Sequence, residues 1–115
     1  MIIFNRLYDF LCFWYVHSKK FPKYDRYTIA KDIFNLLLEI LIQIKRAEVT
    51  GQTYKINQLV EASKKLDAIK ILIRLTNTLQ LVDDKKYITT EDELIQIGKM
   101  IGGWIKSLNT NTRTP

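Results

Sequence analysis

The chain has 115 residues, the length of one domain, and 47% of them are apolar, which is normal for a globular protein. Its formal net charge of +6 favours anionic partners such as nucleic acid, an acidic membrane or an acidic protein surface. A single cysteine and a single histidine exclude an intramolecular disulfide and a zinc site of ordinary ligand count.

The first predicted helix covers residues 2–18 and is apolar on nearly all sides. Arg6 and Asp9 interrupt it, and the unbroken apolar run of residues 10–16 is far shorter than the roughly 20 residues that a membrane span needs. The segment also lacks the basic start and the small-residue cleavage site of a signal peptide. We therefore expect a buried helix in a cytoplasmic protein that has no membrane partner.

Two turn signals frame a second and a third helix. A loop over residues 19–25, around Pro22, precedes a helix over residues 27–49, because proline disfavours the helical conformation of the residue before it. Gly51 suits a helix C-cap, and a long helix over residues 54–80 follows it. This third helix has a predicted core seam with heptad spacing, formed by Leu59, Ala62, Leu66, Ile69 and Ile73.

A fourth helix is predicted to begin at Thr90, after a polar loop over residues 82–89. Thr90 and Glu93 have the spacing of a capping box, in which each side chain bonds the backbone N–H of the other residue. Gly98 and Gly102 lie one turn apart in this helix. Since a glycine costs about 1 kcal/mol inside a helix, we interpret the pair as a close approach by a neighbouring helix rather than as a merely tolerated cost.

Four helices with short connections predict an all-α fold, an antiparallel up-down-up-down four-helix bundle. We expect the bundle to occupy residues 1–108 and a polar, disordered tail to occupy residues 109–115. The first two helices have more apolar surface than a lone bundle can bury, which indicates self-association. The pattern does not give the number of subunits.

The residues that usually carry catalysis do not form a recognisable arrangement. His17 lies beside aromatic residues and Cys12 lies in an apolar run, and we interpret both as structural. The carboxylates of residues 83–84 and 91–93 are predicted to be loop and cap residues rather than a paired acid and base. No glycine-rich phosphate loop occurs. We therefore predict that the protein is not an enzyme and has no catalytic residue, metal or cofactor.

The expected topology gathers positive charge at one end of the bundle, where the turn between the second and third helices meets the start of the first helix and the end of the fourth. The cations at this end are Arg6, Lys45, Arg46, Lys55, Lys106 and Arg113. The third helix adds Lys64, Lys65, Lys70 and Arg74. We predict that these side chains bind nucleic acid or a protein partner, with weak phosphate contacts repeated by symmetry.

Two other interpretations account for part of this basic surface. Cations in a last helical turn suit the helix dipole, and Asp67 can simply pair with Lys70 or Lys64 along the helix. At the opposite end, lysines and arginines are mixed with carboxylates. Tyrosines near the loops can stack unpaired bases, although packing over the bundle ends is the preferred interpretation for each. These tyrosines are Tyr24, Tyr27, Tyr54 and Tyr87.

Two runs of sequence resemble the accessory variability determinant (Avd) proteins of diversity-generating retroelements. They are LDAIKILIRL over residues 66–75 and IGKMIGGWIKS over residues 97–107. The segment FPKYDRY, residues 21–27, is similar to the connection between the first two helices in a wider four-helix-bundle family, which includes proteins encoded in rRNA intervening sequences. The resemblance extends from Tyr8 to Leu108, and the combined motifs are more specific than either run alone.

This resemblance implies a four-helix bundle that assembles into a homopentamer. It also implies a protein that binds the retroelement reverse transcriptase together with template RNA or cDNA, and so supports mutagenic, adenine-directed reverse transcription. Lys70 and Arg74 fall within the matching motif and are the first choices for contact with a partner or with nucleic acid. Gly98, Gly102 and Trp104 fall within the second motif and are assigned to packing.

Two alternatives remain open at this point. The first is a related bundle of the intervening-sequence type, with a structural or RNA-associated role and no polymerase partner. A neighbouring reverse-transcriptase gene would separate it from the Avd-like interpretation. The second, a membrane-surface protein, is weaker because the first two helices lack a broad cationic face.

Overall fold

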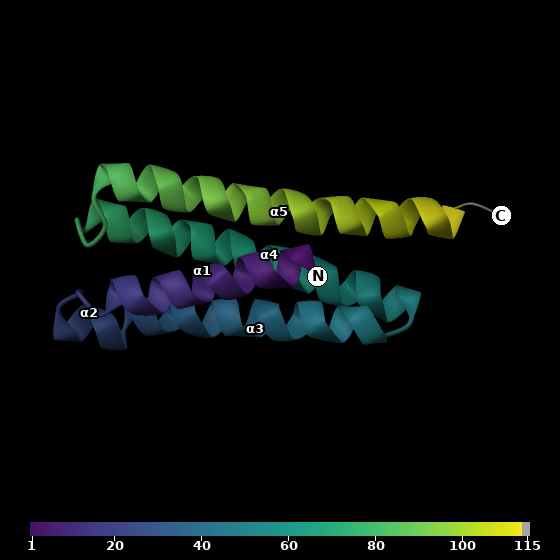
Figure 1. Ribbon diagram of the computed structural model, residues 1–115, viewed down its shortest axis with the longest axis horizontal. Helices are drawn as coiled ribbons and strands as arrows, with labels where there is room; N and C mark the ends of the chain where they lie inside the picture. Colours follow the sequence, from purple (N-terminus) through teal and green to yellow (C-terminus); the bar gives the residue numbers. More distant parts are fainter. Residues whose placement is uncertain (114–115) are drawn as a thin grey trace.

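The computed structural model describes the backbone of residues 1–113 and the side chains of residues 1–109. This part of the chain contains no strand and forms one short and four long helices, which are α1 (Ile2–Ser18), α2 (Lys23–Tyr27), α3 (Ile29–Val49), α4 (Gln52–Thr78) and α5 (Asp84–Arg113). The long helices run alternately up and down in an elongated bundle of 55 × 22 × 20 Å (Figure 1). The predicted all-α, up-down-up-down four-helix fold is confirmed.

The bundle has two ends that differ in their connections (Figure 1). At the α3–α4 end, the turn between α3 and α4 lies near the end of α5 and on the side where α1 begins. The α2 end is the end of the bundle that holds the short helix α2, next to α3, and also the turn between α4 and α5. α1 contacts α3 more extensively than it contacts α5, so the seam between α1 and α5 is the least closed side of the bundle.

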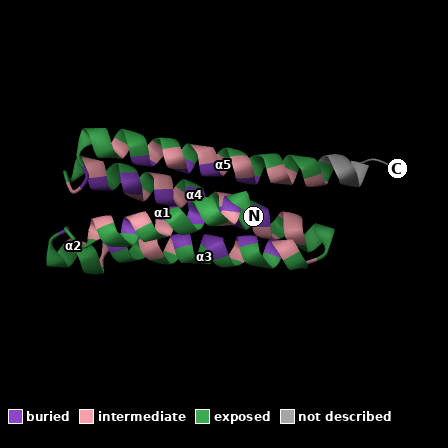
Figure 2. Ribbon diagram, in the orientation of Figure 1, coloured by how far each residue is buried: buried purple, intermediate pink, exposed green. Residues whose placement is uncertain are grey.

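The core is apolar and receives side chains from all four long helices (Figure 2). The predicted heptad seam of α4 is confirmed, since all five of its residues are at most 1% exposed. Trp14 of α1 is buried, and its indole N–H donates a hydrogen bond of 3.0 Å to the carbonyl oxygen of Ala30 in α3. Its ring meets that of Phe21 edge-on, with 5.6 Å between centroids. Trp14 therefore connects α1 to Phe21, which precedes α2, and to Ala30, which follows α2.

The predicted helix over residues 27–49 is wrong at its start, because the chain forms two helices there. Pro22 precedes α2, and the backbone breaks at Thr28, where φ is −114° and ψ is −95°. The Thr28 hydroxyl donates to the carbonyl oxygen of Tyr24 at 2.9 Å. This bond satisfies a backbone acceptor that the break leaves without its helical N–H donor.

The predicted start of the last helix is also wrong, because α5 begins at Asp84. The side chain of Asp83 accepts the backbone N–H of Lys86 at 2.8 Å, which is the N-cap bond of this helix. Thr90 is buried inside α5, and its hydroxyl donates to the carbonyl oxygen of Lys86 at 2.7 Å. The capping box therefore does not form, since Asp83 offers a favourable cap earlier in the chain.

The predicted C-cap role of Gly51 is wrong as well. Gly51 precedes α4 with φ of −63°, an ordinary value for any residue. The left-handed position is Gln80, whose φ is 58°, the one positive φ of a non-glycine residue among those described. The N–H of Gln80 bonds the Asn77 carbonyl, and the N–H of Leu81 bonds the Thr76 carbonyl, each at 2.9 Å. These two bonds form a Schellman motif that ends α4.

Gly98 and Gly102, two of the three glycines of α5, differ in their surroundings. A Cβ at Gly98 would lie 3.3 Å from Cδ2 of Leu66, so the predicted close approach to α4 is present there. At Gly102 the prediction is wrong, because no atom of another described helix lies within 4 Å of the position that a Cβ would take. The backbone of α5 is described as far as Arg113, past Leu108. The division into a bundle and a tail stays a prediction, and residues 114–115 lie outside the described part.

Candidate nucleic-acid and partner interface

The predicted cations of α4 do not share one face of the helix. Nζ of Lys65 lies 3.7 Å from a carboxylate oxygen of Glu39 in α3. Lys70 reaches toward α5, where its Nζ lies 3.5 Å from the position that a Cβ of Gly98 would take. Lys65 and Lys70 therefore flank the buried seam of α4 on opposite sides, so the predicted cations of α4 do not form a single patch.

Carboxylates on α4 itself already hold two of these cations. Nζ of Lys64 lies 3.2 Å from Glu61, and Nζ of Lys70 lies 4.0 Å from Asp67. The ion pair with Lys70 is one that the sequence offered as an alternative to a partner contact. Arg74 is exposed and forms no ion pair within the described residues. It can therefore meet a phosphate without first losing a carboxylate partner.

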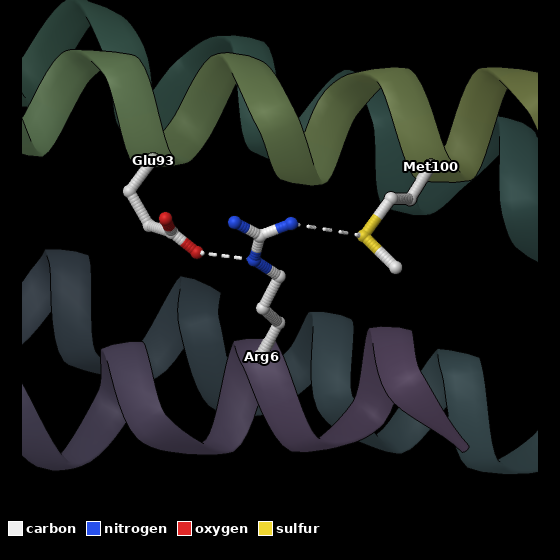
Figure 3. Close-up of polar contacts among 3 residues, drawn as sticks. All are labelled: Arg6, Glu93 and Met100. Carbon is white, nitrogen blue, oxygen red and sulfur yellow. Dashed lines mark hydrogen bonds and ion pairs between the residues drawn. The ribbon is translucent and has the colours of Figure 1, made fainter.

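Arg6 bridges the open seam between α1 and α5 (Figure 3). Its Nε lies 3.0 Å from a carboxylate oxygen of Glu93, and its Nη1 donates toward the sulfur of Met100 at 3.9 Å. The guanidinium thus points across to α5 rather than outward at the end of the bundle. We infer that Arg6 contributes to the attachment of α1 more directly than to an open basic surface.

The remaining predicted cations lie where the topology placed them, toward the α3–α4 end. Lys45 pairs at 3.5 Å with a carboxylate one turn along α3. Arg46 is exposed and Lys55 is half-buried, and neither forms an ion pair within the described residues. Lys106 is exposed on α5. The side chain of Arg113 lies outside the described residues.

Cations without carboxylate partners gather at the α2 end, which the sequence predicted to be electrically mixed. Asp83 is engaged as the cap of α5, and Asp84 accepts a hydrogen bond of 2.9 Å from the side chain of Asn77. On the α1–α2–α3 side of this end, five cations form no ion pair with any described residue. They are Lys19, Lys20, Lys23, Arg26 and Lys31. Sequence reasoning did not single out Lys31.

Three of the four tyrosines near the loops are open to solvent. Tyr24 is 78% exposed, Tyr27 is 67% exposed and Tyr54 is 54% exposed. The preferred interpretation, packing over the bundle ends, is wrong for these three. It holds for Tyr87, which is half-buried against the core. Large exposed aromatic side chains are candidates for contact with bases or with protein.

Two of the clefts beside α1 contain charged side chains, and their charges differ. The cleft between α1 and α5 has a volume of about 440 Å³, and its lining contains Arg6 and Lys86 against three carboxylates. The second cleft lies where α1 faces α2 and α3, has a volume of about 330 Å³ and has no carboxylate in its lining. We call it the α2 cleft, and its side chains include Tyr15, Ser18, Arg26, Tyr27, Lys31 and Phe34.

His17 is packed as a structural residue. Its ring is parallel to that of Phe13 at 5.5 Å between centroids, and its Nε2 has no hydrogen-bond partner among the described residues. Burial lowers the pKa of His17, the charges of Lys86 and Lys20 lower it further, and Asp83 opposes them. In the described residues, no three His, Cys, Asp or Glu side chains form a group that could hold a metal ion. No described helix is both long and apolar enough to cross a membrane.

Comparison with known proteins adds what the geometry cannot supply. No curated protein and no solved structure matches the chain. A family model described as bAvd-like matches residues 1–108, which is nearly the whole chain. The chain therefore belongs to the bAvd-like family, the Avd-like proteins of diversity-generating retroelements.

Proposed function

We propose that this protein is a non-catalytic accessory protein that binds the reverse transcriptase of a diversity-generating retroelement and its template RNA or cDNA, and so supports mutagenic reverse transcription. Membership of the bAvd-like family carries this proposal. The polymerase supplies the chemistry, and the bundle supplies surfaces that hold the enzyme and the nucleic acid together. We place the protein in the cytoplasm, where the retroelement would be copied.

The charge of the chain supports the nucleic-acid half of the proposal. The net charge is +6, and cations without a carboxylate partner occur on α4, at the α3–α4 end and at the α2 end. Such cations release counterions when they meet phosphates, which favours binding and makes it sensitive to salt. The intervening-sequence alternative is less well supported, because the matching family model is the Avd-like one.

We further propose that the protein works as a homo-oligomer, and that the number of subunits is five, as the resemblance to Avd proteins implies. Apolar side chains that a lone bundle leaves exposed support self-association. On α1 and α3 they include Ile2, Tyr8, Val16, Leu38, Ile42 and Val49. Light scattering tests this directly, since the proposal requires five times the monomer mass of 13.6 kDa. A monomer or dimer mass would contradict it.

Titration of labelled single-stranded RNA and DNA at several salt concentrations, followed by fluorescence anisotropy, tests the nucleic-acid half. We expect log affinity to fall linearly with log salt, with a slope of about −0.7 for each phosphate contacted. The double variant Lys70→Glu/Arg74→Glu should weaken binding and make the affinity less sensitive to salt. Absence of binding even at low salt would leave the protein as a polymerase-binding scaffold only.

A further inference from the structure

The α2 cleft is assembled by the break in the chain between α2 and α3. Thr28 interrupts the helix, so Arg26 and Tyr27 lie beside the groove between α1 and α3 instead of continuing α3. The hydrogen bond from Trp14 to the Ala30 carbonyl fixes α1 to this junction. The geometry of the cleft is therefore held by buried contacts, although the side chains around its mouth are exposed.

Aromatic rings at the cleft are available to a ligand. Tyr15 is 54% exposed and lies 6.1 Å from Phe34 between ring centroids, in a tilted pair. Tyr27 has no ring contact and no side-chain hydrogen bond within the described residues. Bases stack on exposed rings of this kind without regard to sequence, because every base has a π-face.

The positive charge at the cleft favours an anionic ligand. Arg26 and Lys31 line it, and Nζ of Lys19 lies 4.7 Å from the centroid of the Tyr15 ring. None of these three cations has a carboxylate partner among the described residues, so a phosphate would displace no ion pair. The only carboxylates within α2 and the first turn of α3 are Asp25 and Asp32, and neither lines the cleft.

The size of the cleft favours a single nucleotide over a protein helix as its ligand. Its volume of about 330 Å³ lies near the lower limit of the roughly 300–1,000 Å³ range of small-ligand pockets. It can receive one base, whereas a docked helix would need a long apolar groove. The cleft between α1 and α5 is larger, but its lining has two cations against three carboxylates and so disfavours a phosphate.

We propose that the α2 cleft binds one unpaired base of single-stranded nucleic acid, stacked on Tyr27, while Arg26 and Lys31 contact the phosphates on either side of it. This inference rests on the proposed nucleic-acid role, and it places the single-strand contact at the opposite end of the bundle from the predicted basic end. Tyr24 is exposed, and Lys20 and Lys23 form no ion pair within the described residues. These three side chains extend the surface along which the strand continues.

The test compares two labelled strands of equal length by fluorescence anisotropy: oligouridine, and the same sugar–phosphate backbone with abasic sites. Base stacking contributes a factor of about 5 to 150 in affinity per base. We expect the wild-type protein to prefer oligouridine by a factor in this range, and Tyr27→Ala to abolish the preference while Tyr27→Phe retains it. Ile88→Ala is the control, since it also removes a large exposed side chain, Ile88 being 66% exposed, and lies on α5 outside the cleft.

A second pair of variants tests the phosphate contacts. Lys31→Ala should reduce the magnitude of the negative slope of log affinity against log salt by about 0.7. Lys99→Ala removes the same charge from an exposed position on α5. The affinity of this control should remain more sensitive to salt than that of Lys31→Ala. Thermal unfolding of each variant confirms that the fold persists, which we expect because Tyr27 and Lys31 are both exposed.

The outcomes are distinguishable. If the wild-type protein binds neither strand, the proposed nucleic-acid role fails and this inference fails with it. If it binds both strands equally, or if Tyr27→Ala and Lys31→Ala bind like their controls, the proposed role stands and the α2 cleft is not the site. A change in assembly mass or in reverse-transcriptase binding without a change in strand binding would make the cleft a protein contact and would overturn the inference.

Discussion

Replacing Trp14 by phenylalanine should destabilise the bundle by about 2–3 kcal/mol. The indole N–H donates to the Ala30 carbonyl at 3.0 Å, and a lost hydrogen bond of this kind costs about 1 kcal/mol. Phenylalanine also lacks two of the ring carbons of tryptophan, and at about 0.8 kcal/mol for each buried carbon group their loss adds roughly 1.6 kcal/mol. Trp14 is 1% exposed, so nearly all of this burial is lost.

Urea unfolding followed by circular dichroism measures this change. With a slope of about 1–3 kcal/mol per molar urea, the midpoint should fall by roughly 0.7–3 M. Both proteins are measured at the same protomer concentration, because self-association raises apparent stability. Trp104→Phe is the matched control, since Trp104 is only half-buried and has no side-chain hydrogen bond among the described residues. Equal, small effects of the two substitutions would refute the structural role assigned to Trp14.

Two further predictions concern acid stability and Gly102, which has open space at its Cβ position. The pKa of His17 lies below its unfolded value of 6.5 because burial and the charges of Lys86 and Lys20 disfavour the imidazolium. The unfolded chain therefore binds this proton first, so stability should fall as pH drops below about 6.5, and thermal unfolding of His17→Phe should show a smaller loss. Gly102→Ala should raise the unfolding free energy by up to about 1 kcal/mol, since nothing obstructs the new methyl group. A loss of stability or of assembly mass there would show that another copy packs on Gly102.

Much of the fold could be predicted from apolar spacing alone. The first helix was predicted over residues 2–18 and forms there, and the heptad seam of α4 is buried as expected. The errors lie at helix ends, where a few polar groups compete. Asp83 caps α5 before Thr90 can, and Gln80, rather than a glycine, adopts the left-handed conformation that ends α4. In each case a local hydrogen bond that the residue pattern does not specify decided the boundary.

The candidate interface was harder to predict because its properties depend on how the helices are rotated against one another. The positions of Lys65 and Arg6 along the chain do not show that Glu39 and Glu93 lie across a seam from them. Conversely, Lys31 became a candidate only when the break at Thr28 brought it beside α1 and α2. Inter-helix contacts therefore decide which of the predicted cations are held by carboxylates and which remain available.

Co-purification with the reverse transcriptase tests the central claim most directly. The tagged protein would be co-expressed with the reverse transcriptase of its retroelement, treated with nuclease and isolated, and the molar ratio of the two proteins would be measured. We predict that the polymerase remains bound in a fixed ratio after nuclease treatment, because the accessory protein contacts it directly. Complete loss of the polymerase would contradict the account, since the two proteins would then share only a nucleic acid.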